Sequence, residues 1–192
     1  MIFDMDGTLV TSQLDFVAMR KAVGCPAEQD ILTYIDDIAD DQHRHQAIAQ
    51  IESMELEDAH QSEIIDGVAE ALACLQQQDI RTAVVTRNCR AATDIKLQKA
   101  GLRFEQVLTR ECAPAKPDPT ALLQIAKSWS LTPQQTIYVG DYLHDINAAI
   151  NAGMRSVLMT LQGPPDWAHD ATWQFASYAE FLAFFNDRNC SE

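Results

Sequence analysis

Two acidic residues near the start of the chain have a spacing that suits chemistry on a bound anion. Asp4 and Asp6 lie two residues apart in the sequence Asp-Met-Asp-Gly-Thr, directly after the apolar pair Ile2-Phe3. On an extended backbone, residues two apart point to the same face, so both carboxylates can reach one bound group. Gly7 permits a turn in which the backbone comes close to that group. One acid could attack while the other transfers protons, although an Asp-Gly turn with helix-capping acids has the same sequence.

Two further elements supply groups that could hold a phosphate. Thr86, Arg87 and Asn88 follow an apolar run and precede a predicted helix, so they offer a hydroxyl group and free backbone N–H groups to an anion. Lys116 lies in the sequence Lys-Pro-Asp-Pro, in which the prolines restrict the backbone that carries the ammonium group. Both elements also have an ordinary structural explanation, because Thr and Asn often cap helices and proline often begins one.

The fourth element carries two acids that suit a metal ion. Asp141 and Asp145 follow Gly140, at which a predicted strand ends. Carboxylate oxygens are hard ligands of the kind that Mg²⁺ takes, and the ion keeps other positions for water and phosphate. Capping of the next helix by one of these acids is the alternative. Together the four elements are a stronger signal than any one alone, because ligands bind at the carboxyl ends of strands in open α/β sheets.

The elements that would position these residues alternate between strands and helices, which is typical of an α/β fold with a parallel sheet. Short apolar runs predict strands at residues 2–3, 82–86, 106–108, 136–140 and 156–159. Amphipathic periodicity predicts helices at residues 68–78, 91–100, 119–130 and 145–152. Gly101 and Gly153 would end two of these helices. The aromatic residues after the turn at residues 163–165 are expected to pack a final helix onto the sheet.

Residues 13–66 differ in kind from the rest of the chain. They contain no β-branched strand run, and their apolar residues recur at helical spacing. The segment is therefore expected to be a small all-helical insert between the first strand and the first helix of the sheet. Its acidic stretch at residues 36–41 is expected to be a solvated helix end and loop, not a metal cluster, because charge runs are usually exposed.

In their order and spacing, the four elements resemble the haloacid dehalogenase superfamily, and the resemblance extends from Asp4 to Met159. It implies a Rossmann-like parallel sheet of order 5-4-1-2-3, flanked by helices, with the first strand at the centre. It also implies a helical cap after that strand, so that residues 1–12 and 67–192 form the core domain and residues 13–66 the cap domain. The presence of Asp6 resembles the phosphatases of the family, above all the phosphoglycolate phosphatase-like branch, since its dehalogenases lack this acid.

The resemblance implies Mg²⁺-dependent hydrolysis of a small phosphomonoester. Asp4 would be the nucleophile that forms an aspartyl-phosphate, and Asp6 would be the general acid/base. The Mg²⁺ ligands would be the Asp4 side chain, the Asp6 carbonyl oxygen and the Asp141 side chain, with Asp145 near the ion. The groups that hold the phosphoryl oxygens would come from Gly7, Thr86, Arg87, Asn88 and Lys116. Charge neutralisation and in-line positioning are most of what phosphoryl transfer needs.

Two features depart from the family pattern, and two alternatives stay open. Arg87 stands where many relatives have a small residue or Asn, and the chain begins only three residues before Asp4, which leaves a minimal first strand. A sugar phosphomutase of the same family would need cap residues that hold a bisphosphate, and Arg20 and Lys21 are the candidate contacts to substrate. A non-catalytic binding protein would be expected to have lost the nucleophile or a metal-binding acid, and both are present.

Composition bears on partners and location. The net charge of -14 over 192 residues would repel nucleic acid, and no basic stripe offsets it. Apolar runs are all shorter than the roughly 18 residues that predict a membrane span, and the acidic N-terminus does not resemble a secretory signal. The cysteines show no CxxC pair that would indicate a zinc site. We therefore expect a cytoplasmic monomer or homodimer whose partner is a small phosphorylated metabolite.

Overall fold

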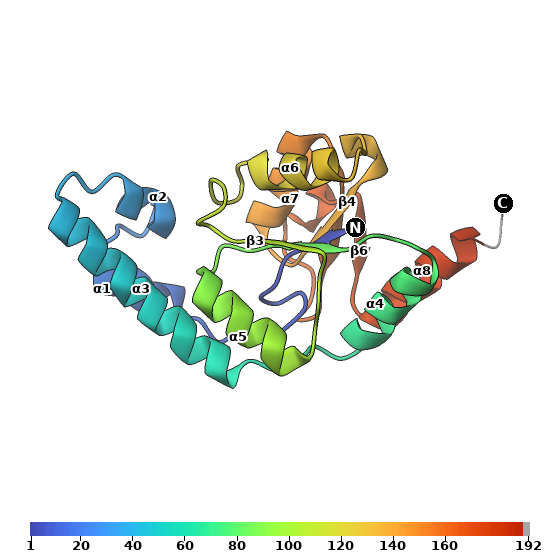
Figure 1. Ribbon diagram of the computed structural model, residues 1–192, viewed down its shortest axis with the longest axis horizontal. Helices are drawn as coiled ribbons and strands as arrows, with labels where there is room; N and C mark the ends of the chain where they lie inside the picture. The colour runs from blue at the N-terminus through green and yellow to red at the C-terminus, as the bar shows by residue number, and fades with distance from the viewer. Residues whose placement is uncertain (190–192) are drawn as a thin grey trace.

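Six parallel strands form the centre of the protein, as a computed structural model of the chain shows (Figure 1). The structure describes residues 1–189, so Cys190 lies outside the described part. The strands are β1 (Ile2–Phe3), β2 (Ala83–Val85), β3 (Gln106–Leu108), β4 (Ile137–Gly140), β5 (Arg155–Met159) and β6 (Trp173–Phe175). Their order across the sheet is β3-β2-β1-β4-β5-β6. Read from β5 to β3, this confirms the expected order 5-4-1-2-3.

The central position of β1 follows from its residues. Phe3 is completely buried and lies opposite Val84 of β2 on one side and Val139 of β4 on the other. A parallel strand that is apolar on both faces requires a layer of helices on each side of the sheet. The backbone N–H of Asp4 continues the pairing by donating to the carbonyl oxygen of Val139, at 2.8 Å. Asp4 is therefore held at the edge where the strands end.

Helices cover both faces of the sheet. One face packs against α4 (Val68–Gln77), α5 (Arg90–Ala100) and α8 (Tyr178–Asn189), and the other against α6 (Thr120–Ser128) and α7 (Leu143–Ala152). Two short 3-10 helices lie at Pro133–Gln135 and Ala168–Asp170. As expected, Gly101 and Gly153 end α5 and α7, each in the left-handed conformation that glycine adopts without strain. Two separate apolar clusters result, one on each face.

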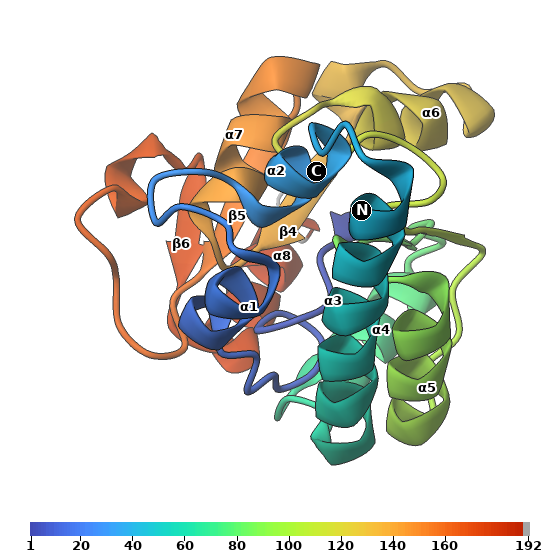
Figure 2. The ribbon, with the colours of Figure 1, turned by 90° about the vertical axis from the view of Figure 1, so that its left-hand side faces the viewer.

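The segment between β1 and α4 is helical, as its apolar spacing predicts. It contains α1 (Phe16–Val23), α2 (Ile31–Asp36) and α3 (Asp41–Gln61). Asp15, Asp30 and Asp40 cap these helices by accepting backbone N–H groups of the first turn. The three helices share a small apolar cluster of their own and lie to one side of the sheet (Figure 1). Figure 2 shows α3 running alongside α5, which joins this segment to the rest of the protein.

The acidic stretch at residues 36–41 lies at the end of α2 and the start of α3. Its four aspartates, Asp36, Asp37, Asp40 and Asp41, are exposed to solvent. The expectation of a solvated helix end and loop is confirmed.

The aromatic residues near the C-terminus form a strand as well as a helix. The final helix, α8, was expected, and Phe181 on it is completely buried. The sequence interpretation missed β6, which pairs with β5 and places Phe175 opposite Met159. Its residues, Trp-Gln-Phe, lie in the aromatic-rich stretch that is expected, as a whole, to pack a final helix onto the sheet. The sheet therefore has one more edge strand than the expected order contains.

None of the helices within residues 1–189 combines the length and the apolar composition that crossing a membrane requires.

Candidate active site

The four predicted chemical elements meet at one edge of the sheet. Asp4 follows β1, Thr86 follows β2 and Asp141 follows β4, and these three strands are neighbours in a parallel arrangement. Lys116 reaches the same place from the loop before α6. All four residues line a cavity of about 340 Å³ that helices α1, α2 and α3 close from the other side.

Most of the predicted site residues line this cavity. They are Asp4, Asp6, Gly7, Arg20, Thr86, Arg87, Asn88, Lys116, Asp141 and Asp145. Lys21 does not line it, because its side chain lies on the exposed side of α1. The geometry thus separates two neighbouring basic residues that the sequence could not distinguish.

Lys116 joins two carboxylates at the bottom of the cavity. Its Nζ lies 2.5 Å from Oδ1 of Asp4 and 2.6 Å from Oδ1 of Asp145, and all three residues are buried. Asp145 also accepts hydrogen bonds from the hydroxyl of Tyr138 at 3.1 Å and from the backbone N–H of Tyr142 at 3.0 Å. Asp145 therefore both holds Lys116 and caps α7. From the sequence, helix capping and a role in the site were alternatives, and this side chain does both.

Two glycines allow the acids to come this close. A Cβ atom on Gly140 would lie 2.4 Å from the Cβ of Asp145, which is too short for any two carbon atoms that are not bonded. Gly7 has a φ angle of +68°, and a Cβ there would lie 2.1 Å from Oδ2 of Asp141. The backbone N–H of Gly7 donates to the carbonyl oxygen of Val10 at 2.9 Å. Gly7 therefore shapes the turn and makes room for Asp141, while its N–H is already bonded.

Burial and crowding of the carboxylates disfavour the ionisation of Asp4 and Asp141. One oxygen each of Asp4, Asp141 and Asp145 lie within 4.8 Å of one another, with one lysine among them. Burial and the neighbouring Asp145 raise the pKa of Asp4 to about 7, and the same two causes raise the pKa of Asp141 to about 8. A cation between the oxygens would remove this repulsion. A buried cluster of carboxylate oxygens is the donor set that hard divalent ions take, so these residues fit such an ion.

Asp6 is held by two donors that come from different elements. Oδ1 of Asp6 accepts from Nζ of Lys96 on α5 at 2.5 Å, and Oδ2 accepts from the Asn88 side-chain amide at 2.6 Å. Asn88 also donates to the hydroxyl oxygen of Thr86 at 3.1 Å. The loop after β2 therefore contacts the acid that follows β1, as well as facing the cavity.

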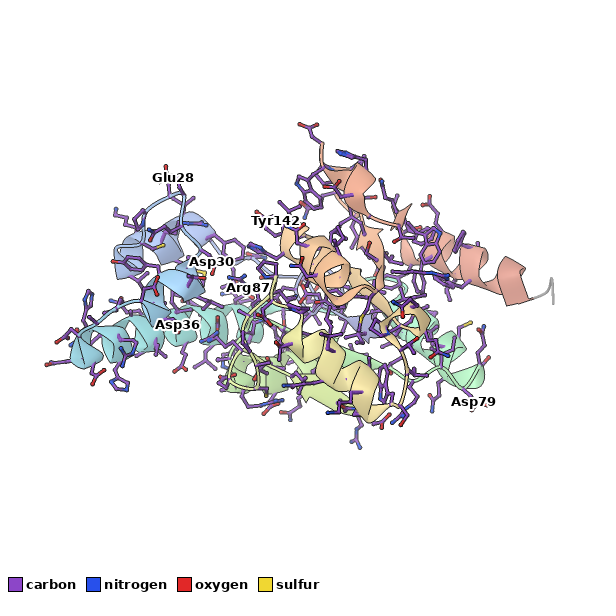
Figure 3. All side chains as sticks on the ribbon, turned by 90° about the horizontal axis from the view of Figure 1, so that it is seen from above. Glu28, Asp30, Asp36, Asp79, Arg87 and Tyr142 are labelled. Atoms are coloured by element: carbon purple, nitrogen blue, oxygen red, sulfur yellow. The ribbon has the colours of Figure 1, made fainter. Side chains whose placement is uncertain are left out.

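Arg87 bridges the sheet and the helical segment. Its guanidinium lies 2.5 Å from Oδ2 of Asp30, at the start of α2, and also donates to the carbonyl oxygen of Lys116. Nε2 of His144 lies 3.7 Å from the same oxygen of Asp30. Figure 3 shows Asp30 and Arg87 close together at the junction between the helices and the sheet. This arginine is thus already paired with protein groups while it lines the cavity.

The helical segment gives the cavity a mainly apolar wall. Its apolar lining residues are Leu14, Phe16, Met19, Ile31, Leu32 and Ile51. Among the described residues 13–66, Arg20 is the one basic residue that lines the cavity. Its guanidinium makes long hydrogen bonds, of 3.4 Å to the carbonyl oxygen of Gln29 and 3.5 Å to that of Phe16.

Sequence interpretation missed several charged residues around the site. Lys96 is completely buried, and its second carboxylate partner is Asp58 of α3, at 2.7 Å. Glu55 of α3 pairs with Arg110 and accepts the backbone N–H that begins α5. A signal for Lys96 was present in the sequence, because it lies four residues after Ala92 and four before Ala100, in line with apolar residues on one face of the predicted helix. The acidic partners carry no such signal, since acids on long helices are usually exposed.

The fold and the site define an α/β enzyme with a lysine and several carboxylates at the carboxyl ends of its central strands. Residues 1–159 match the family described as haloacid dehalogenase-like hydrolase. A haloacid dehalogenase-like hydrolase domain-containing protein of Arabidopsis thaliana is 33% identical over 87% of this chain and 74% of its own length. The chain therefore belongs to the haloacid dehalogenase-like hydrolase family.

Two further comparisons agree with this assignment. An N-acetylmuramic acid 6-phosphate phosphatase of Pseudomonas putida is 27% identical, over 88% of each chain. The crystal structure of a predicted phosphoglycolate phosphatase from Haemophilus somnus has the same fold, with a TM-score of 0.74 and 24% identity over 96% of each chain. The sequence similarities thus show the family, and the structural similarity shows the fold.

Proposed function

We propose that this hydrolase is a Mg²⁺-dependent phosphatase that cleaves a small phosphomonoester through an aspartyl-phosphate on Asp4, as in the phosphoglycolate phosphatase-like branch. The observation that carries the proposal is the cluster of Asp4, Lys116, Asp141 and Asp145. Nζ of Lys116 lies 2.5 Å from Asp4 and 2.6 Å from Asp145. Under this proposal Asp4 is the nucleophile, Lys116 is the cation that offsets phosphate charge, and the acids of the cluster hold the metal ion. That combination supplies what phosphoryl transfer needs.

The proposed reaction has two steps, each carried by residues of this chain. In the first, an oxygen of Asp4 attacks phosphorus while the bond to the leaving oxygen breaks, and Asp6 gives that oxygen a proton. In the second, Asp6 takes a proton from water, the water oxygen attacks phosphorus, and the bond to Asp4 breaks to release inorganic phosphate. Lys116 and the Thr86 hydroxyl would hold the phosphoryl oxygens. Mg²⁺, bound by Asp4, Asp141 and the Asp6 carbonyl oxygen, would neutralise phosphate charge.

We propose residues 13–66 as a cap domain that selects the substrate. The apolar wall and Arg20 support this proposal, because they form the side of the cavity that the leaving group would face. The mutase alternative would need several cations there to hold a second phosphate. Within the described residues 13–66, Arg20 is the one basic residue that lines the cavity. A cytoplasmic location and a monomeric or homodimeric state stay predictions.

Release of phosphate from an activated aryl phosphate, with and without Mg²⁺, tests the proposed function. The expected result is metal-dependent release of free phosphate, with transient labelling of the enzyme. Conversion of a sugar phosphate to its isomer without phosphate release would favour the mutase instead. Binding of phosphate esters without any turnover would favour a non-catalytic protein.

The Asp6→Asn variant should still form the covalent intermediate but release it slowly. Its backbone carbonyl can still bind Mg²⁺, and a good leaving group needs little protonation, so some aspartyl-phosphate should form from an aryl phosphate. General acid/base catalysis is typically worth about 10²- to 10⁴-fold, so steady-state release should fall by that factor. Rapid-quench measurement of labelled enzyme and steady-state phosphate release check this. Wild-type turnover of an ester with a poor leaving group would show that Asp6 has another role.

Arg20→Ala should change substrate preference, and Lys21→Ala provides the matched control. Arg20 lines the cavity, whereas Lys21 on the same helix is exposed. A hydrogen bond to a charged group is worth about 1.5 to 3 kcal/mol, which corresponds to roughly a 10- to 100-fold rise in KM for esters that contact Arg20. Initial rates across a panel of phosphorylated metabolites measure this effect. An identical ranking of substrates for both variants and the parent would exclude Arg20 as a specificity residue.

A further inference from the structure

Lys96 is a buried cation that the proposed reaction does not use. It lies on α5 with no exposed side-chain surface, and its Nζ lies 2.5 Å from Asp6 and 2.7 Å from Asp58. A lysine is almost never fully buried unless it is paired, because its charge loses the hydration that water provides. A methionine or leucine would fill such a space at a lower desolvation cost. The two short ion pairs therefore indicate that the positive charge of Lys96 is there to bind Asp6 and Asp58.

The Asp58 side of the cluster connects it to the chain that leads into the helical segment. Oδ2 of Asp58 accepts from the hydroxyl of Ser12 at 2.9 Å, and Oδ1 accepts from the backbone N–H of Gln13 at 2.6 Å. Asp58 itself lies on α3, which packs lengthwise against α5 (Figure 2). One carboxylate thus ties together the segment after β1, helix α3 and the lysine on α5.

The Asp6 side of the cluster faces the cavity. Oδ1 of Asp6 is held by Lys96 and Oδ2 by Asn88, yet 24% of the side chain stays exposed. Lys96 reaches Asp6 from α5 and Asn88 from the loop after β2, so the two donors fix the direction in which the carboxylate points. Proton transfer to a leaving oxygen depends on that direction, because the donor must come within hydrogen-bond reach of it.

We propose that Lys96 is a positioning residue for Asp6, and that Asp58 holds Lys96 in place when α3 lies against α5. The inference rests on the proposed function, since it assigns Lys96 to the acid/base of that reaction. Proton transfer at the leaving oxygen then depends on the docking of a helix from the proposed cap, although neither Lys96 nor Asp58 touches substrate.

The test compares Lys96→Met with Lys99→Met. Lys99 lies on the same helix and bonds the carbonyl oxygen of His60 on α3, so its replacement controls for loss of a lysine contact between α3 and α5. The measured quantity is the rate of phosphoenzyme formation in single turnovers with two matched substrates, an alkyl phosphate and an aryl phosphate. The alkyl ester needs a proton on its leaving oxygen, whereas the aryl ester needs little.

Lys96→Met should slow phosphoenzyme formation from the alkyl ester by about 10²-fold, the loss that a misplacement of about 1 Å can cause. The rate with the aryl ester should change little, and Lys99→Met should behave as the parent with both. A structural defect would lower both rates of Lys96→Met together. If Lys96→Met keeps the parent's ratio of the two rates, the inference is wrong.

Two further arms keep the result interpretable. If Lys96→Met does not fold, Asp58→Asn provides the second variant, because it keeps Lys96 and removes the negative charge that supports it, while the amide oxygen can still accept from Ser12 or Gln13. Its ratio should fall in the same direction, and an unchanged ratio contradicts the inference. If the parent enzyme forms no phosphoenzyme from either ester, the proposed function itself fails. An active parent with an unchanged Lys96→Met ratio overturns the inference alone.

Discussion

The Asp4→Asn variant is expected to show no turnover and no phosphorylated enzyme at any pH. An amide is not a nucleophile toward phosphorus, and the substitution also removes a negative charge and one carboxylate oxygen from the acidic cluster that fits a metal ion. Removal of acid/base catalysis alone is expected to lower the rate by about 10²- to 10⁴-fold, and the loss of turnover in Asp4→Asn should be larger than that. Rapid-quench labelling with an aryl phosphate, together with steady-state phosphate release, measures both effects.

The position of Asp4 explains why no neighbour should replace it. Asp145 also pairs with Lys116, but both of its oxygens are already bonded. Its Oδ1 bonds Lys116 and the hydroxyl of Tyr138, and its Oδ2 accepts from backbone N–H groups at the start of α7. Asp141 lies against the turn at Gly7. Asp4 alone follows the central strand with its carboxylate held by Lys116 and facing the cavity.

Asp79→Asn is a suitable control for this substitution. Asp79 is exposed, has a positive φ angle of 54° that Asn also adopts readily, and lies far from Asp30 and Arg87 in Figure 3. It should retain the parent's activity. Labelled enzyme in the Asp4→Asn variant, or normal turnover by it, would show that the nucleophile lies elsewhere.

Removal of divalent ions is expected to abolish turnover, and added Mg²⁺ should restore it. Lys116 by itself cannot balance a phosphate dianion beside Asp4, Asp141 and Asp145, three acids whose oxygens lie within 4.8 Å of one another. Dialysis against a chelator followed by titration with Mg²⁺ measures the requirement, with K⁺ at matched ionic strength as the control. Full activity in excess chelator would contradict the metal assignment.

The effect of pH on metal binding follows from the raised pKa values. Burial and Asp145 raise the pKa of Asp4 to about 7 and of Asp141 to about 8, both from 3.8. At pH values between 3.8, the pKa of an unfolded aspartate, and the raised pKa values of about 7 to 8, the metal-free folded chain binds more protons than the unfolded chain. The stability that these protons contribute is present at low pH and is lost as the pH rises through 7 to 8. Protons and the ion compete for the same oxygens, so Mg²⁺ should bind more tightly above pH 8 than at pH 6.

Thermal unfolding with and without Mg²⁺ checks this dependence. An ion present at 100 times its Kd stabilises the folded state by about 2.7 kcal/mol, which raises the Tm by roughly 5 to 11 °C for a chain of this size. The rise should be larger at pH 8.5 than at pH 6 at one fixed Mg²⁺ concentration. Equal shifts at the two pH values would show that Asp4 and Asp141 do not compete with protons for the ion.

Three of the four chemical elements could be located from the sequence because each directly follows a strand, and the fourth, Lys116, was recognised by the prolines around it. Thr86 and Asp141 follow apolar runs that predict strands, and Asp4 follows the short apolar pair Ile2-Phe3. In a parallel sheet the residues that follow neighbouring strands meet at one edge. The helical nature of residues 13–66 was likewise visible in their apolar spacing. The strand β6 was not, because its aromatic residues lie in the same stretch as those of α8 and were assigned with them to the packing of a final helix.

The charged pairs around the site could not be predicted in this way. Arg87 pairs with Asp30, 57 positions away, and Lys96 pairs with Asp6, 90 positions away. The sequence around Arg87 or Lys96 does not indicate which acid each will pair with. The same holds for the helical segment: Arg20 and Lys21 are neighbours in sequence, and only the packing of α1 shows which one faces the cavity.

The sequence by itself thus determined the type and order of the main elements and the residues at the carboxyl ends of the central strands, since periodicity within one element indicates which of its faces is buried. The tertiary structure alone decided which charges pair across elements and which side chains of the helical segment reach the cavity. The physical reason is that a hydrogen bond or ion pair forms only when two groups come within about 3 Å. For groups on different elements, that distance is set by how α3, α5 and the sheet pack together, and no spacing along the chain encodes it.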